Sequence, residues 1–562
     1  MKSIYSIFFV VFLHMNLFSQ NNQIFGDTIQ IEVKENDTIK IQWQCSFDSI
    51  NWENIIGENN NILNYIINDD MFFRAKLSTE NCVWNSTTKT IKFDNSKKIY
   101  GVRIDRKKPA ENRIERILNS KSKESFSQIE GQEIFVKDDF KGTYPFNSMR
   151  VCNVIKNGTL SKIIYENESD FNRKQDTFVE IPLFYMKRYF ESDFDYRLIS
   201  QTQYEGFYPA PMFIEGGKII DKVYVGVYET TIDDGGIARS VSGKIPANYK
   251  TMTEFRDLYY AKGAGFSTVD FRTLMSIQHL FLIRYANKNS SESVGGGWAG
   301  LIQPIKTILN TGVTNKIVLK NSSDLTNSYW FIGQNVCTVN GYQIKEYAEL
   351  VSIQPNIPVQ GQTTFVVNKD LNIDGTVTFG SAPQNTGWSD ILTHDTGRTK
   401  NNTTSKVNEA CSVKLFGIEN LWGNVWEFVD GLFFKGLTPY ISFNSLRYNY
   451  YKEYTPTSFQ CIEQNSLLPV GGTFGFIENL GINDTYSWLC FPDSYGKNGV
   501  NGSSGYGDFY YQLNDLTYIR CTAYGGGFDH FDRAGIFNFR NWEYTNWRWY
   551  LYGSRMQYKQ IN

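Results

Sequence analysis

The sequence predicts a β-rich α+β protein made of more than one domain. The chain has 562 residues, which is too many for one ordinary hydrophobic core. Aromatic residues make up 16% of it, with 35 Tyr and 41 Phe, and such residues are enriched in strands. Its 45 Gly indicate many turns between those strands. The clearest helical stretches are 251–262 and 270–287.

Composition and charge narrow the possible partners and cofactors. The chain is 41% hydrophobic and 20% charged, which is typical of a folded protein rather than a disordered one. Its net charge is −2 and no block of Lys and Arg stands out, so a nucleic-acid partner is not expected. The 4 His and 8 Cys show no zinc-type spacing, so we expect no metal and no cofactor.

The first 20 residues have the pattern of a secretory signal peptide. Lys2 precedes a mostly apolar stretch over 4–18, and polar residues follow at 19–22. The apolar stretch is shorter than the ~20 residues of a membrane span. The alternatives to a signal peptide are a short membrane anchor and a buried first strand. No later run is apolar enough to cross a bilayer, so the mature chain is expected to have no integral membrane segment. Secretion permits disulfides, and Cys45 with Cys82 is the plausible local pair.

Residues 21–97 are expected to form a small first domain. Apolar and polar residues alternate over 29–33 and 39–43, as in half-buried strands. The segment WQCSFDSINW, followed by FFRAKL, resembles the immunoglobulin-like repeats of bacterial secreted and virion proteins. That resemblance implies an Ig-like β-sandwich, acting either as a spacer or as a weak adhesion module.

The next segments are expected to form a platform and a larger domain with an insertion. Short apolar strands flanked by Gly or Pro fill residues 98–215, which we interpret as a β-rich platform leading into a domain over 216–562. Within that domain, 270–287 has a wide apolar face and charges that suit the helix dipole. Alternating stretches at 363–367 and 375–380 predict that 295–405 is a β-rich insertion.

A resemblance covers the chain from about residue 99 to its end. The segments YGVRID, VEIPLFYMK, VYVGVYE, FGIENLWGNVWEFVDGL and a closing GSR resemble phage tail-associated receptor-binding proteins, including retroelement-diversified ones. Such proteins end in a C-type-lectin fold of the formylglycine-generating-enzyme type, which is the fold implied here for 216–562. We expect Trp422 and Trp426 to anchor a core from one helical or turn face, and Gly423 and Asn424 to form a tight turn.

The last forty residues have the composition of a binding surface, because aromatic residues alternate there with Arg and Asn. The resemblance divides them into scaffold and presented residues. The scaffold set also includes four residues of the earlier segment around Trp422. Its members are Trp422, Gly423, Asn424, Trp426, Gly525, Gly526, Phe528, Ala534, Gly535, Phe537, Gly553 and Arg555. The presented, ligand-binding set is Asp529, His530, Phe531, Arg533, Asn538, Arg540, Trp542, Glu543, Tyr544, Trp547 and Trp549.

Strand periodicity supports part of this division. Asn538 and Arg540 would share one face of a strand, with the scaffold residue Phe537 on the other. Trp547 and Trp549 would likewise share a face. The alternative for any single aromatic residue is that it fills a core or a subunit interface.

A surface of this kind favours sugars, because flat rings stack on sugar rings while Arg, Asn, Asp and Glu bond hydroxyl or acidic groups. We therefore expect a non-enzymatic adhesin that binds mucin-type or bacterial surface glycans. A single weak site is usually offset by several copies, so we expect an oligomer, with a trimer favoured. The resemblance implies a virion component, whereas the signal peptide favours a host-encoded secreted adhesin that binds a glycan or a protein.

Enzymatic alternatives have little support in the sequence. The sulfatase-activating relatives of the fold need a reactive Cys pair near the end of the domain, but no Cys follows Cys521. A polysaccharide-degrading enzyme needs two carboxylates in a cleft, and no motif proposes such a pair. The segment 354–356 is only a fragment of a calcium-dependent sugar-binding loop, so calcium-independent binding is expected.

Overall fold

The computed structural model confirms a β-rich fold, with three short or medium helices among many antiparallel strands in its described part. The description covers residues 11–14, 27–32, 40–57, 59–60, 62–67, 71–79, 83–86, 88–91, 95–130, 133–157, 160–297, 306–321, 330–399, 411–436, 438–445, 448, 455–456, 473–483, 485–496, 499–513, 517–530 and 533–560.

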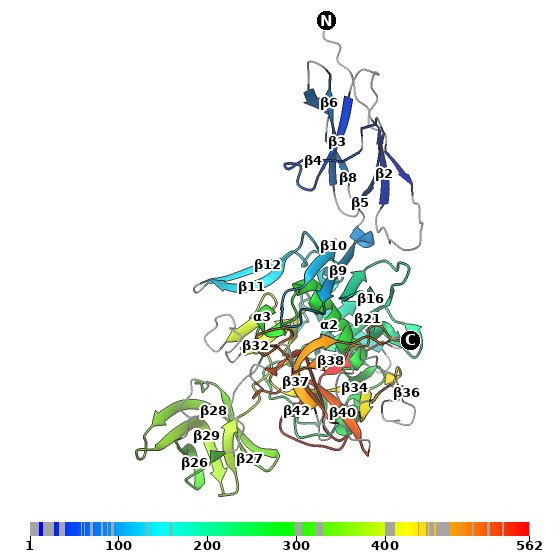
Figure 1. Ribbon diagram of the computed structural model, residues 1–562. Coiled ribbons are helices and arrows are strands. Elements are labelled where there is room, and N and C mark those ends of the chain that lie inside the picture. Colours follow the sequence, from blue (N-terminus) through cyan, green and yellow to red (C-terminus); the bar gives the residue numbers. More distant parts are fainter. Residues whose placement is uncertain are drawn as a thin grey trace.

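The described strands between residues 11 and 91 form a lobe at one end of the molecule (Figure 1). One of its sheets has the order β1 (Val11–His14), β2 (Asp27–Glu32), β5 (Ile62–Ile67). The other has the order β4 (Glu53–Asn54), β3 (Lys40–Ser46), β6 (Met71–Ser78), β7 (Val83–Asn85), with β8 (Lys89–Ile91) beside β6. Residues from both sheets enclose one core, in which Trp43 and Phe73 are fully buried.

Two sequence expectations fall on this lobe. Within the expected signal peptide, Val11–His14 forms β1 against β2, and the rest of residues 1–20 lies outside the described residues. Cys45 lies on β3, whereas Cys82 lies outside the described residues. The pairing of these two cysteines therefore stays a prediction.

The body of the molecule begins at residue 95 and contains three larger sheets. The first has the order β10 (Glu115–Leu118), β9 (Ile99–Asp105), β17 (Phe194–Ser200), β16 (Tyr185–Glu191), β18 (Tyr208–Pro209). The second has the order β14 (Leu160–Tyr165), β13 (Arg150–Asn157), β15 (Thr177–Pro182), β21 (Lys222–Gly226), β43 (Met556–Tyr558), β24 (Phe266–Thr268). The third has the order β36 (Thr455–Pro456), β35 (Thr438–Ile441), β34 (Trp426–Lys435), β40 (Ile519–Gly525), β41 (Gly535–Asn541), β39 (Phe509–Gln512), β37 (Thr473–Leu480), β38 (Pro492–Tyr495), with β42 (Tyr552–Gly553) beside β34.

Short elements complete the body. They are β11 (Ser125–Glu130) with β12 (Glu133–Asp138), β19 (Ile214–Glu215) with β20 (Lys218–Ile219), β22 (Thr231–Ile232) with β23 (Ala238–Arg239), and β31 (Thr396–Thr399), β32 (Cys411–Leu415) and β33 (Ile418–Glu419). The helices are α1 (Met252–Lys262), α2 (Phe271–Tyr285) and α3 (Ser290–Ser293), and three 3-10 turns span Asn95–Lys97, Phe146–Ser148 and Pro211–Phe213.

Both helices expected from the sequence are confirmed, and each begins after a side-chain cap. The Thr251 hydroxyl accepts from the Glu254 amide while the Glu254 carboxylate accepts from the Thr251 amide, so α1 has a complete capping box. Asp270 caps α2 in the same way by accepting from the Thr273 amide. Helix α2 is buried on every side rather than on one face, and it contacts strands of different sheets, β9, β17 and β34.

One hydrophobic core joins two segments that the sequence suggested as separate units, the platform over 98–215 and the domain over 216–562. β43, near the end of the chain, pairs with β21 and extends the sheet that begins with β14 and β13. One large hydrophobic core contains Val102 and Ile199 from the platform together with Val429 and Phe537 from the later segment. The boundary at residue 215 therefore runs through one continuous core.

The insertion is β-rich, as the sequence predicts, and it forms a lobe of its own (Figure 1). Its sheet has the order β25 (Lys306–Thr307), β30 (Thr378–Ser381), β27 (Asn335–Asn340), β28 (Gln343–Pro355), β29 (Gln362–Ile373), β26 (Gly312–Lys320). A separate core fills it, with Phe365 and Phe379 fully buried. In the part of the chain that the structure describes, no helix has the length and apolar character needed to cross a membrane.

Candidate ligand-binding surface

The C-terminal stretch enters the body as strands instead of standing out from it. β40 and β41 lie in the middle of the third sheet, and β42 and β43 join β34 and β21. Tyr524, Phe537 and Tyr552 are consequently fully buried. Much of the aromatic density that predicted a presented surface therefore belongs to the hydrophobic core, and only part of it reaches solvent.

The side chains expected to be scaffold are buried, in line with a structural role. Those with 2% exposure or less are Trp422, Asn424, Trp426, Phe528, Ala534, Phe537 and Arg555. Gly423, Gly525 and Gly526 have φ of 84°, 89° and 87°, the left-handed region that favours glycine. At Gly535 a Cβ atom would lie 1.7 Å from Oδ1 of Asp508, and at Gly553 one would lie 2.7 Å from the Val425 side chain.

The two scaffold tryptophans do not share one face, which corrects the sequence expectation. Trp422 packs into the large core with α2, whereas Trp426 packs into a second core with Phe428 and Tyr552. The reason is the turn between them, where Gly423 and Asn424 both have positive φ and Trp426 begins strand β34. The chain changes direction there, so a spacing of four residues does not place both rings on one side.

A buried ion pair joins the closing GSR to the Trp426 segment. Arg555 donates to Glu427 through Nε at 3.1 Å and through Nη2 at 2.5 Å. Its remaining donors bond the carbonyl groups of Gly226, Val227, Glu419 and Asn420 at 2.8–3.0 Å. Burial by itself would lower the pKa of Arg555, but Glu427 outweighs it and raises that pKa. Arg555 is therefore a charged structural residue and not part of a solvent-facing site.

The presented part of the stretch gathers around Arg540. The Cζ atom of Arg540 lies 5.2–5.9 Å from the centres of four aromatic rings, within the range of cation–π contacts. These rings belong to Tyr511, Trp542, Trp549 and Trp426. The His530 ring stands edge-on to Trp426 at 4.8 Å. We call Arg540 with Tyr511, His530, Trp542 and Trp549 the Arg540 surface. All five residues are half-buried, and the buried Trp426 ring packs beneath them.

Arg540 keeps its charge, and its Nη1 group is not used in any hydrogen bond to the described residues. Its Nε and Nη2 atoms donate to Oε1 of Glu543 at 3.0 and 2.8 Å. Burial alone would lower the pKa of Arg540, but Tyr552 and Glu543 raise it. Nη1 has no hydrogen-bond partner among the described residues. The guanidinium is thus fixed in orientation by Glu543 while one edge can still bind an outside acceptor.

Three residues of the predicted presented set are buried, which corrects their assignment. Asn538 is fully buried and donates to the Arg533 carbonyl, because both faces of the central strand β41 are covered. Glu543 is 5% exposed, and it accepts from Arg540 and from the Tyr552 hydroxyl. The Asp529 side chain is 2% exposed and lies 3.0 Å from Nδ1 of His530. These three residues therefore lie beneath the solvent-facing side chains and have no exposed side chain with which to bind a ligand.

The other predicted residues lie at the edges of the Arg540 surface. Arg533 is exposed, with its guanidinium 5.0 Å from the Phe509 ring. Tyr544 packs instead against Tyr518 and the Arg520 guanidinium, the latter at 3.8 Å. Trp547 is half-buried beside the insertion, and Phe531 lies outside the described residues.

Sequence reasoning missed Tyr511 and Tyr342. Tyr511 comes from β39, which pairs in parallel with β41 and so carries its ring beside Arg540. The alternation of Phe509 and Tyr511 was a signal that could have revealed it. Tyr342 comes from the insertion, far away in the sequence, and no local pattern connects it to this surface.

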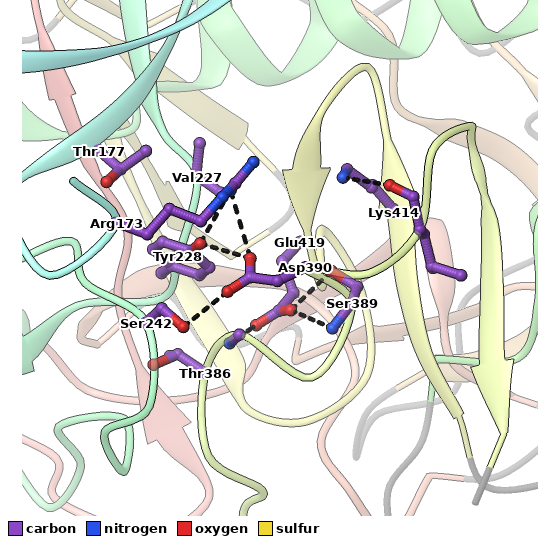
Figure 2. A network of polar contacts seen from close by, with 12 residues as sticks. Arg173, Thr177, Val227, Tyr228, Ser242, Thr386, Ser389, Asp390, Lys414 and Glu419 are labelled. Carbon is purple, nitrogen blue, oxygen red and sulfur yellow. Dashed lines mark hydrogen bonds and ion pairs between the residues drawn. The ribbon is translucent and has the colours of Figure 1, made fainter. Parts of the chain in front are cut away.

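A second polar cluster fixes the loop by which the insertion returns to the body (Figure 2). The Asp390 carboxylate accepts from Arg173 at 3.3 Å, from the Tyr228 hydroxyl at 2.5 Å and from the Ser242 hydroxyl at 2.6 Å. Beside it, Glu419 accepts from the amides of Gly387 and Ser389. These hydrogen bonds connect residues 386–390 to Arg173, Tyr228, Ser242 and Glu419, so we interpret this cluster as a clamp on that loop.

Two other buried carboxyl groups form no ion pair within the described part of the chain. Burial, followed by the nearby Glu427, raises the pKa of Glu229, and one of its oxygens has no hydrogen-bond partner among the described residues. Burial likewise raises the pKa of Asp508, which accepts from the Phe537 amide. Within the described ranges, no three side chains of metal-binding type gather in one place.

Comparison with known proteins adds no relative: no protein-family model and no curated protein matches the chain. The fold and the site alone describe the protein: it is β-rich, and its C-terminal segment contributes most of an aromatic surface centred on Arg540.

Proposed function

We propose that this chain is a non-enzymatic adhesin or receptor-binding protein that binds cell-surface or mucin-type glycans through the Arg540 surface. The observation that carries the proposal is the gathering of half-buried aromatic rings around one charged, incompletely bonded guanidinium. Tyr511 and Trp549 pack against the second core but stay half-buried, whereas Tyr524 and Tyr552 are buried completely. Trp542 and Trp549 retain solvent exposure beside that charge.

Sugars suit this arrangement better than a purely apolar ligand does. Trp and Tyr rings offer flat apolar area at little cost in conformational entropy, and can stack on the apolar face of a sugar ring. Arg540 can donate from Nη1 to a hydroxyl, carboxylate or sulfate group, and a charge-assisted bond of this kind is stronger than a neutral one. Because Glu543 fixes the guanidinium, little ordering is needed on binding.

The location and assembly of the protein belong to the same proposal. The resemblance to phage tail proteins supports a place on the virion surface, and the apolar first residues support a secreted adhesin encoded by the host. In both cases one small surface binds weakly, so several copies acting together, as in a trimer, would supply the avidity that attachment needs.

The proposal is tested by screening the full mature chain against mucin and bacterial surface polysaccharides. Changing Trp542 or Trp549 to Ala should each weaken binding by about tenfold or more, as expected for an aromatic anchor. A matched control is Trp52→Ala in the N-terminal lobe, where a half-buried Trp also lies under an arginine, Arg74. Equal binding by wild type and by a folded Trp542→Ala variant would refute the site, and release of reducing sugar would indicate an enzyme instead.

A further inference from the structure

The tip of the insertion lies against the C-terminal stretch. Strands β27 and β28 form a hairpin whose two-residue turn is Gly341 and Tyr342, closed by the pair Asn340 and Gln343. Gly341 has φ of 59°, as the first position of a type II′ turn requires. The Tyr342 ring lies 5.3 Å from the Trp547 ring and 6.0 Å from the Trp549 ring, in an inclined and an edge-on arrangement.

The hairpin is attached to the body by contacts that do not use the Tyr342 side chain. The Tyr550 amide donates to the backbone carbonyl of Tyr342 at 3.0 Å. Further along the hairpin, Asn248 donates to the Tyr347 hydroxyl at 2.5 Å. The Tyr342 side chain itself is largely free: the residue is 53% exposed, and its hydroxyl has no hydrogen-bond partner among the described residues. A ring that served only to fasten the insertion would be more deeply buried.

Trp549 connects this tip to the Arg540 surface. Its ring centre is 6.0 Å from that of Tyr342 and 5.9 Å from Cζ of Arg540. Beyond Arg540 lie Trp542 and Tyr511, at 5.8 and 5.2 Å from the same atom. The two lobes thus contribute to one chain of contacts, which runs from Tyr342 to Trp549 and Arg540, and from Arg540 to Trp542 and Tyr511. We call its aromatic members the row of rings.

We infer that Tyr342 is a further binding residue and that the row of rings takes an internal stretch of a linear polysaccharide, rather than a single terminal sugar. The inference rests on the proposed function, because it extends the same surface. A terminal sugar needs one or two stacking rings beside a polar group, which the Arg540 surface already provides. Tyr342 ends this chain of contacts next to Trp549, so a ligand that reaches both Tyr342 and Arg540 extends past Trp549. The insertion then has a role, since it lengthens the binding surface.

The experiment uses the full mature chain and a panel of mucin, hyaluronan, alginate and bacterial capsular polysaccharide. For each panel member that wild type binds, fragments sorted by length are titrated against wild type and against Tyr342→Ala and Trp542→Ala. We expect wild-type affinity to rise with fragment length. Trp542→Ala should lose about tenfold at every length. Tyr342→Ala should lose about tenfold for long fragments and much less for the shortest fragment that binds.

Two matched variants separate binding from folding. Tyr342→Phe keeps the ring and should follow the wild-type length dependence, and Val313→Ala changes another exposed side chain of the insertion and should also match wild type. An identical length dependence for wild type and Tyr342→Ala would overturn the inference while leaving the proposed function intact. Failure of wild type to bind any panel member would overturn both. Equal loss at all lengths in Tyr342→Ala would place Tyr342 in the short site, and would also refute the extended one.

Discussion

Replacing Arg555 by Met should open the body where β34 meets the end of the chain. The Arg555 side chain is fully buried and that of Glu427 is 2% exposed, so the carboxylate has no access to water as an alternative partner. Arg555 makes two hydrogen bonds to Glu427 and four to backbone carbonyls. A methionine fills a similar space but supplies none of these donors.

The expected loss follows from these contacts. Removing one partner of a buried ion pair costs about 3–5 kcal/mol, because the other charge stays buried without compensation. Glu427 can escape part of this cost by taking up a proton, since burial already raises its pKa and Arg555 no longer opposes the effect. The loss should therefore be smaller at pH 5 than at pH 8. A matched surface pair, Arg548 with Glu254, has side-chain exposures of 49% and 37%, and Arg548→Ala should cost only about 0–1 kcal/mol.

Hydrogen exchange of peptides covering β34 and β43 is the suitable assay, because a chain with several cores need not unfold in one step. The opening free energy of these amides should fall by about 3–5 kcal/mol in Arg555→Met and hardly change in Arg548→Ala. Adding Glu427→Leu to Arg555→Met should restore part of the loss by removing the unpaired charge. Similar losses in the buried and the surface variant would refute the reasoning.

Two further predictions follow from the described geometry. Because folding raises the pKa of Glu229 above its ordinary value of 4.5, the stability that this group contributes is complete below pH 4.5 and declines as the pH rises toward the folded pKa. Glu229→Gln should therefore be more stable than wild type at pH 8 and nearly equal to it at pH 4 in thermal unfolding, and parallel pH profiles would contradict this. Gly423→Ala should destabilise by several kcal/mol, since a Cβ atom would lie 1.7 Å from the Gly297 carbonyl oxygen. Gly236→Ala is the control, because Gly236 also has a positive φ of 78° but a Cβ atom there would meet nothing within 4 Å. It should lower the free energy of unfolding by only about 1 kcal/mol. Equal losses in the two variants would show that backbone strain, and not the close contact, causes the destabilisation.

Local patterns predicted the features that depend on neighbours in the sequence. The helical stretches 251–262 and 270–287 follow from the local residue pattern, and caps between residues only three positions apart fix their starts in the structure. The turn at Gly423 and Asn424 follows from residues that tolerate positive φ. The β-rich insertion follows from alternation alone. None of these features requires knowledge of what packs against the segment.

The site was predictable only in part, because exposure depends on what covers a strand. The alternation over 537–540 placed Asn538 outside, but β41 lies between β40 and β39 with both faces covered, so Asn538 is buried. Glu543 was expected to be presented, yet it is the buried counter-ion of Arg540. A period of two identifies which side chains share a face, but not whether that face meets solvent.

The sequence by itself determined that the chain is β-rich, where its two longer helices begin, and that its last forty residues combine aromatic rings with arginine. Tertiary structure decided which of those rings form a core and which surround Arg540. It also brought Tyr511 from β39 and Tyr342 from the insertion to the same surface. The physical reason is that capping, turns and alternation act over a few residues. A binding surface is instead assembled by strand pairing and lobe packing between segments that are distant in the chain.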